Sequence, residues 1–253
     1  MSPLSQAEDR RSEVLTRRKA LQLLEADSTN PFIRSEEQRH PWSVDPIQTL
    51  HCPLLHGPLL RVWDSKSGRQ PEGDNRMLSR SPDQRLDTEQ ARKTSLVIHL
   101  DHKVRESTPY ISFTKSPSAI EEIVAWRSTK RGAQTLTVID PNVRLNNGLP
   151  IVDVVAEMQH YGIQDPYNKG NRYYIDHYVC LWEVTKEEIV DHYEWEELAK
   201  RAKWYEEIIM PDFRRFSRRN VLAPTRTSAS NMSTMIESLP SKSLSYTGSY
   251  MQS

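Results

Sequence analysis

Polar side chains with ligand-binding chemistry interrupt two apolar segments of the chain. Arg61 lies inside the apolar run 59–63, and Ser112 and Thr114 alternate with apolar residues in 110–114. Because side chains alternate between the two faces of a strand, the two hydroxyls share one face. A buried arginine needs partners for its donors, and hydroxyls, carbonyls or a bound phosphate supply them. These residues are candidates for an anion site; the alternative is an arginine at a sheet edge and hydroxyls that face solvent.

Histidines and a cysteine offer a second kind of chemistry, metal binding. His99 and His102 are three residues apart on an expected helix, and His51 and Cys52 lie upstream. Zinc sites use a second ligand pair at a defined spacing, and the sequence contains none. We therefore expect solvated or hydrogen-bonding histidines on a surface helix, and no metal.

Motifs of nucleophilic catalysis and of phosphate cradling are absent. The chain has no G-x-S-x-G elbow, P-loop or G-x-G-x-x-G, and it contains only 8 glycines. The 34 basic and 34 acidic residues give zero formal net charge, so no global field favours nucleic acid or an anionic membrane. The run 212–220 interleaves arginines with two phenylalanines, but such runs are more often solvated helix ends than nucleic-acid or nuclear-import sites. Nucleic acid is not an expected partner.

The elements that must position these side chains follow from the periodicity of the apolar residues. Strands are expected at 59–63, 110–114, 136–140 and 178–184. Helices are expected at 13–24, 91–103, 118–131, 151–161 and 186–210. The pairs Ser118–Glu121 and Thr185–Glu188 form capping boxes that open the helices over 118–131 and 186–210, and Pro211 ends the latter. The pattern predicts an α+β fold, with a small mixed β-sheet and flanking helices.

Composition divides the chain into three parts. Hydrophobic residues make up 36% of the 253 residues, below the usual share for a globular domain, and 16 prolines outnumber the glycines. We expect a flexible N-terminal arm over 1–57 and a folded domain over 58–210. Residues 211–253, basic and then rich in serine and threonine, are expected to form a disordered tail because they cannot bury enough apolar surface.

The order of these segments resembles the ADP-ribosyltransferase fold. A strand that contains an arginine is followed by a strand with hydroxyl side chains, then by a helix, and then by a late strand that begins after polar residues. The resemblance implies that Arg61 holds a phosphate or ribose of NAD and that Ser112 and Thr114 buttress the pocket. It places a carboxylate near Asp176 and His177, where it would stabilise the oxocarbenium-like ribose as nicotinamide leaves. The resemblance also implies that these side chains converge in one cleft.

A more specific resemblance covers about residues 58–190. Ordered motifs of this chain are similar to those of a fungal domain family, DUF7587, whose members remotely resemble ADP-ribosyltransferases. The motifs lie at 60–68, 99–102, 108–114, 136–140, 148–162 and 176–179.

One position departs from that family pattern, because His177 stands where the pattern has a glutamate. A neutral histidine cannot stabilise an oxocarbenium ion as a carboxylate does, and a protonated one repels it. Asp176 is adjacent but would point to the opposite face of the strand. The resemblance therefore predicts a degenerate pocket that binds a nucleotide, with NAD as the possible cofactor, and does not turn it over.

Two other functions stay open on the sequence. One is an active NAD-dependent ADP-ribosyltransferase or NAD glycohydrolase that uses Asp176 or a relocated glutamate. The other is a protein-interaction module that uses the charged helix expected at 186–219.

The sequence also gives an expected compartment. Neither a signal-peptide core nor a run of 18 apolar residues is present, so the cytoplasm or nucleus is expected and a membrane partner is not. The two cysteines are too few for a disulfide framework. Cys180, inside an apolar strand, is expected to be buried and inert, and Cys52, in a proline-rich segment, to be accessible.

Overall fold

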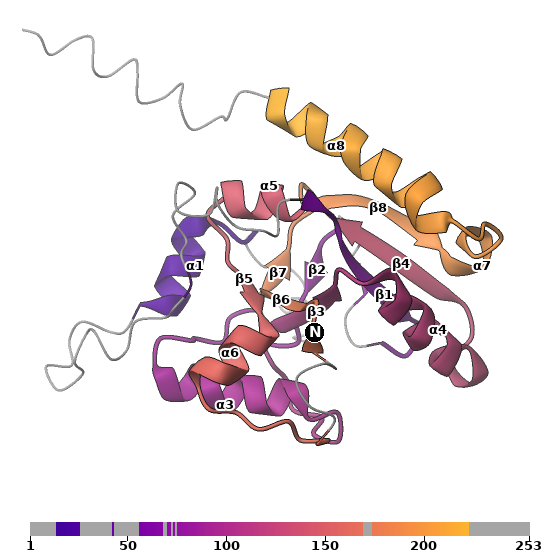
Figure 1. The fold of residues 1–253 in the computed structure, drawn as a ribbon. Helices are drawn as coiled ribbons and strands as arrows, with labels where there is room; N and C mark the ends of the chain where they lie inside the picture. The colour runs from indigo at the N-terminus through magenta and orange to yellow at the C-terminus, as the bar shows by residue number, and fades with distance from the viewer. Residues whose placement is uncertain are drawn as a thin grey trace, which may run out of the picture. The chain divides into compact units, whose positions relative to one another are not determined.

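A six-stranded antiparallel sheet organises the fold of the computed structural model, which describes residues 14–25, 42, 56–67, 70–71, 73, 75–168 and 174–222. Its strand order is β5-β6-β3-β1-β4-β8 (Figure 1). The strands are β1 (Leu59–Asp64), β3 (Tyr110–Thr114), β4 (Gln134–Ile139), β5 (Ile151–Asp153), β6 (His177–Leu181) and β8 (Ile189–Glu194). A second, two-stranded sheet pairs β2 (Met77–Leu78) with β7 (Glu183–Val184).

The predicted α+β class is confirmed, but the expected mixed sheet is wrong in detail, because every described pairing is antiparallel. The sequence shows a strand, a helix and a strand in succession over 110–140, which is typical of neighbouring parallel strands. In the structure β1 lies between β3 and β4, so these two strands run in the same direction without touching. The upstream strand β1 lies between β3 and β4 and pairs antiparallel with each of them.

Side-chain caps define where most helices begin. They are α1 (Arg17–Leu24), α3 (Glu89–Leu100), α4 (Pro117–Arg131), α5 (Pro141–Asn146), α6 (Val154–His160), α7 (Trp195–Leu198) and α8 (Met210–Leu222). The Thr88 hydroxyl caps α3, and Ser116, two residues before the predicted Ser118, caps α4. The predicted helices over 91–103 and 118–131 are confirmed to within a few residues.

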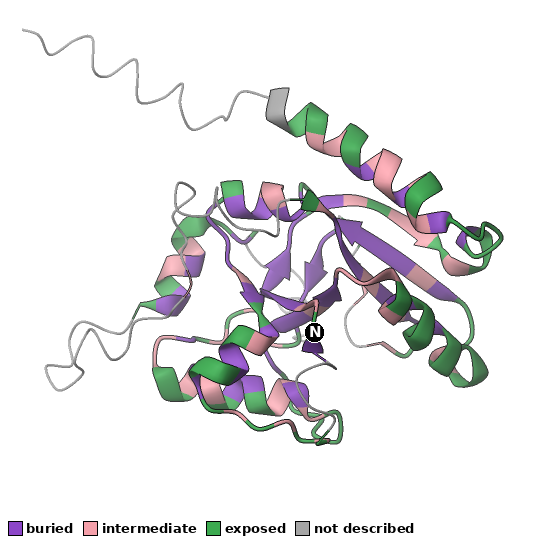
Figure 2. Cartoon of the chain, viewed as in Figure 1, coloured by how far each residue is buried: buried purple, intermediate pink, exposed green. Residues whose placement is uncertain are grey.

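Hydrophobic clusters on both faces of the sheet form the core. Tyr110, Val179 and Leu181 pack with α3 and α6 in one cluster, and Leu60 and Val62 pack with α4 in another. Ile111 and Phe113 lie in a third cluster, on the face of β3 that Ser112 does not share. Figure 2 shows the result, with mostly buried strands and exposed outer faces on α3 and α4.

The predicted helix over 186–210 is wrong in its first half. Residues Ile189–Glu194 form β8, which pairs with β4 and places His192 opposite Thr137. The Thr185–Glu188 pair that resembled a helix cap does form, since the Thr185 amide and hydroxyl donate to the Glu188 carboxylate. It closes a turn into a strand instead, because β4 offers an unpaired edge.

The C-terminal part of that segment is helical but irregular. A short α7 is followed by a π-helical stretch, Tyr205–Ile209, and then by α8, which continues through Pro211 and so does not end there. The Tyr193 hydroxyl donates to Asp212, and the Ser217 hydroxyl donates to Asp140. The chain divides into two compact units after Ser217, and of the second only 218–222, the end of α8, is described.

Part of the expected flexible arm belongs to the folded domain. In α1 the side chains of Ala20, Leu23 and Leu24 are buried in the same cluster as Tyr110. The Leu15 amide donates to Glu183, so the helix is tied down at its start as well. The rest of the arm, with Cys52, and the expected tail lie outside the described residues, except for 211–222 in α8.

A buried ion pair fixes the turn between the late strands. Arg144 on α5 and Glu188 are both fully buried, with 2.9 Å between their charged atoms. Arg144 also donates to the carbonyls of Pro150, Leu181 and Glu183, so its guanidinium is saturated with acceptors. Removing one partner of such a pair is strongly destabilising, because the remaining charge stays buried.

In the described part of the chain, no helix is long and apolar enough to cross a membrane.

Candidate functional site

The candidate site forms where β1 separates from β3. Strand β1 follows β4 from Leu59 to Asp64 but has only one register partner on β3, Leu60 opposite Thr114. Beyond that point the Arg61 guanidinium donates a 3.0 Å hydrogen bond to the Ser112 carbonyl. A side-chain donor thus replaces the ladder hydrogen bond that a longer pairing would supply.

His99 links the same strand to α3. Its Nδ1 lies 2.8 Å from the Thr108 hydroxyl and its Nε2 lies 2.8 Å from the Ser112 hydroxyl. Burial lowers the pKa of His99 to about 3, helped by the charges of His177 and Arg61. The ring is therefore neutral at physiological pH, and it holds the Ser112 hydroxyl in place.

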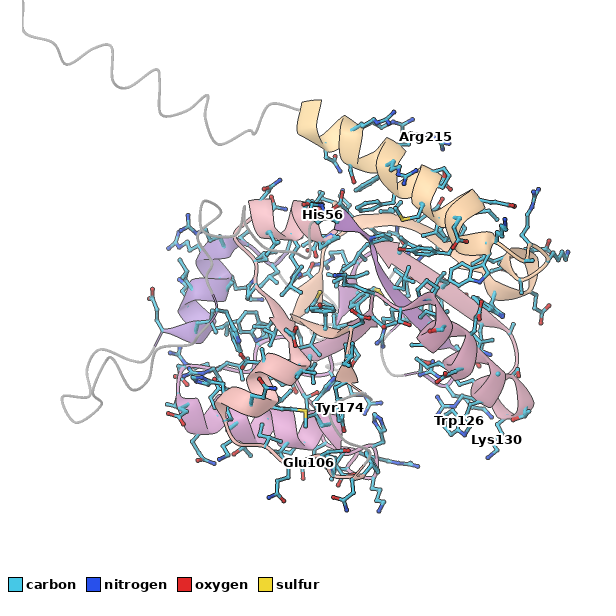
Figure 3. All side chains as sticks on the ribbon, in the orientation of Figure 1. His56, Glu106, Trp126, Lys130, Tyr174 and Arg215 are labelled. Atoms are coloured by element: carbon cyan, nitrogen blue, oxygen red, sulfur yellow. The ribbon has the colours of Figure 1, made fainter. Side chains whose placement is uncertain are left out.

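His177 opens β6 directly opposite Thr114. Burial lowers the pKa of His177 to about 4, with contributions from the charges of His102 and Arg61. Tyr174, labelled in Figure 3, stacks on the His177 ring with 6.2 Å between centroids. Among the described residues no group forms a hydrogen bond with this ring, so its nitrogens are open to a ligand.

Positive groups dominate the electrostatics of what we call the Arg61 cluster, namely Arg61, His99, Ser112 and His177. Each of the four is partly exposed, so solvent reaches the cluster. Burial, together with the charge of Arg127, lowers the pKa of Arg61 to about 10. The strongest charges that act on His99 and His177 also belong to arginines and histidines. With both histidines neutral, Arg61 carries the positive charge of the cluster, and a bound anion would favour the charged form of Arg61 and of both histidines.

The sequence-predicted residues divide into those that the structure brings together and those that it does not. Arg61 is hydrogen-bonded to Ser112, His177 is close enough for the charge of Arg61 to lower its pKa, and Thr114 lies opposite His177. The Thr114 hydroxyl, however, accepts from the Ser116 amide and serves a local turn. Asp176 has a positive φ of 63° and its carbonyl accepts from Lys115, while its carboxylate has no hydrogen-bond partner among the described residues.

The sequence predicts His99 as a metal ligand or as a solvated or hydrogen-bonding histidine on a surface helix, without indicating its partners. In the structure His99 is hydrogen-bonded to Ser112, and His102 stacks on Tyr167. A signal for this existed, since His99 is three residues after the buried Leu96 and therefore near the inner face of its helix. Within the described residues, no three metal-ligating side chains lie close enough to share an ion.

Comparison with protein families matches residues 55–198, more than half of the chain, to a domain of unknown function, DUF7587. The chain belongs to the DUF7587 family. The resemblance drawn from the ordered motifs is thereby confirmed at the level of the family, and the match spans β1 to α7, which includes the whole Arg61 cluster. No curated protein and no solved structure matches the chain.

Proposed function

We propose that the DUF7587 domain of this protein binds a phosphate-containing nucleotide at the Arg61 cluster and does not transfer its ADP-ribose group. The observation that supports this most directly is the charge of the cluster. A guanidinium and two neutral histidines meet at one strand junction, and the strongest charges around the histidines are positive.

Arg61 is the proposed anion-binding group. Its Nε is buried and has no hydrogen-bond partner in the described part of the chain, while its Nη1 already donates to the Ser112 carbonyl. A phosphate oxygen would accept from the unused donors and compensate the desolvated charge. NAD or ADP-ribose fits this chemistry and agrees with the resemblance to ADP-ribosyltransferases.

His177 and Tyr174 would contact the non-phosphate part of the ligand. The neutral ring of His177 can donate to or accept from a ribose hydroxyl, and Tyr174 stacks on the face of that ring. Neither residue supplies a negative charge. Stabilisation of an oxocarbenium-like ribose needs a carboxylate, so this arrangement favours binding over cleavage.

The competing functions have less support. The Asp176 carboxylate is not among the charges that act on His177, which argues against a relocated catalytic carboxylate there. The expected charged helix over 186–219 includes the strand β8, so an interaction surface would need another location.

Calorimetric titration of the full chain with NAD and with ADP-ribose tests the proposal. Arg61→Gln should weaken binding by roughly tenfold or more, because hydrogen bonds between charged groups are lost. Arg215→Gln is the matched control, since Arg215 lies on α8 and pairs with Asp212 (Figure 3). Absence of binding to either ligand would refute the proposal.

The same protein tests whether the missing carboxylate is what prevents turnover. Wild-type protein with bound NAD should release no nicotinamide above the buffer rate. His177→Glu should raise nicotinamide release above that background, because it restores the carboxylate that the family pattern contains. Nicotinamide release by the wild-type protein would instead establish an active transferase or glycohydrolase.

A further inference from the structure

A hollow lies between α4, β4 and α7, and none of its lining residues belongs to the Arg61 cluster. Its volume is about 310 Å³, within the range of sites for small ligands or single side chains. The lining includes Glu121, Ala125 and Ser128 from one stripe of α4. Gln134 of β4 and the consecutive Trp195 and Glu196 of α7 also line it. We call it the α4–α7 pocket.

The lining of this pocket is acidic. Glu121 and Glu196 are its charged residues, and no basic side chain is among the lining residues. The basic side chains at the end of α4 are engaged elsewhere. Lys130 and Arg131 lie over the ring of the exposed Trp126, and Arg131 also pairs with Asp64. Figure 3 shows Trp126 and Lys130 together at the end of α4.

Aromatic contacts preorganise one of the two carboxylates. Trp204 is 4% exposed and its indole N–H donates a 2.9 Å hydrogen bond to Glu121 Oε1. The same indole packs edge-on against Trp195, with 5.3 Å between ring centroids. Glu121 and Trp195 are therefore held in fixed relation to each other, and one oxygen of Glu121 keeps its acceptor capacity.

An unsatisfied acceptor lies in the wall of the pocket. Gln134 is 5% exposed, and its amide nitrogen donates to the Val124 carbonyl. Its Oε1 is buried and has no hydrogen-bond partner among the described residues. A buried acceptor without a partner is destabilising, so a donor that entered the pocket and reached it would be stabilised there.

From these contacts we infer that the α4–α7 pocket receives an arginine side chain of a partner polypeptide. The guanidinium matches the site because it is planar, permanently charged and carries five donors, which can stack on Trp195 while they reach Glu121 and Glu196. The apolar stem would lie against Ala125. A lysine ammonium has fewer donors and no plane to stack, so it fits less well.

The test uses the full chain labelled with 5-fluorotryptophan, with the Trp195 signal assigned by Trp195→Phe. The probe is an acetylated and amidated Ala-Arg-Ala tripeptide, and its neutral counterpart contains citrulline, which has nearly the same shape. The arginine peptide should shift the Trp195 fluorine signal saturably, and the citrulline peptide should bind roughly fivefold or more weakly.

Neighbouring glutamates provide the matched control. Glu121→Gln keeps an acceptor for Trp204 and should weaken arginine binding by roughly fivefold, whereas Glu122→Gln, an exposed residue outside the lining, should leave it unchanged. Equal shifts with both peptides, equal effects of the two variants, or no saturable shift would each overturn the inference.

Discussion

Glu157 on α6 offers the sharpest quantitative test of the structure. The residue is 5% exposed, and burial raises the pKa of its carboxyl from 4.5 to about 7. The charge of Arg92 acts in the opposite direction and does not compensate for burial. The native state therefore keeps a proton that the unfolded chain releases at lower pH.

The sign of the effect follows from this difference. Because the native pKa is the higher one, the contribution to stability is fully present below pH 4.5 and is lost as the pH rises through about 7. The pKa difference corresponds to about 3 kcal/mol of unfolding free energy. Glu157→Gln removes the titration, so the stability of the variant relative to wild type should rise by up to about 3 kcal/mol between pH 4.5 and pH 8.

Urea denaturation monitored by tryptophan fluorescence at pH 5 and pH 8 measures this difference. Subtracting the unfolding free energy of the wild type from that of the variant cancels the contribution of the buried histidines, because they titrate in both proteins. Glu106→Gln is the control, since Glu106 is exposed and should give the same difference at both pH values (Figure 3). The reasoning would be refuted if the unfolding free energy of Glu157→Gln relative to wild type were the same at pH 5 and pH 8, or lower at pH 8.

Three further outcomes are expected. Glu188→Gln should lower the unfolding free energy by about 3 kcal/mol, because it leaves the fully buried Arg144 charge unpaired, and urea midpoints near wild type would contradict this. Cys180, whose pKa burial raises to about 12, should resist thiol reagents in the native protein and react after denaturation, so rapid native labelling would count against its place in β6. Affinity of the Arg61 cluster for ADP-ribose should rise as pH falls from 8 towards 5, since a bound anion raises the pKa of His177 from about 4, and calorimetry in buffers of different ionisation enthalpy should show proton uptake.

Local rules in the sequence were sufficient for the central elements. The alternation in 110–114 predicted β3 and the shared face of Ser112 and Thr114, because a strand has a period of two residues whatever surrounds it. The helix α4 followed from apolar spacing together with hydroxyl and proline signals at its start, and α3 was predicted from its own segment without a start signal. These features depend on residues near one another in the chain, so no knowledge of the fold was needed.

The tertiary structure decided what depends on partners distant in sequence. The helix predicted over Ile189–Glu194 rested on the capping pair before it and on the charged residues that follow. Its β-branched Ile189 and Val190 suit a strand, and the edge of β4 supplies the hydrogen bonds that make it one. The role of His99 depends likewise on Thr108 and Ser112, which the fold brings to it from outside its helix. Arg61 was recognisable as a candidate from its apolar surroundings, but only the separation of β1 from β3 gives its guanidinium the Ser112 carbonyl. Sequence periodicity specifies which way a side chain points along its own element, whereas the groups that it meets are fixed by long-range pairing and packing.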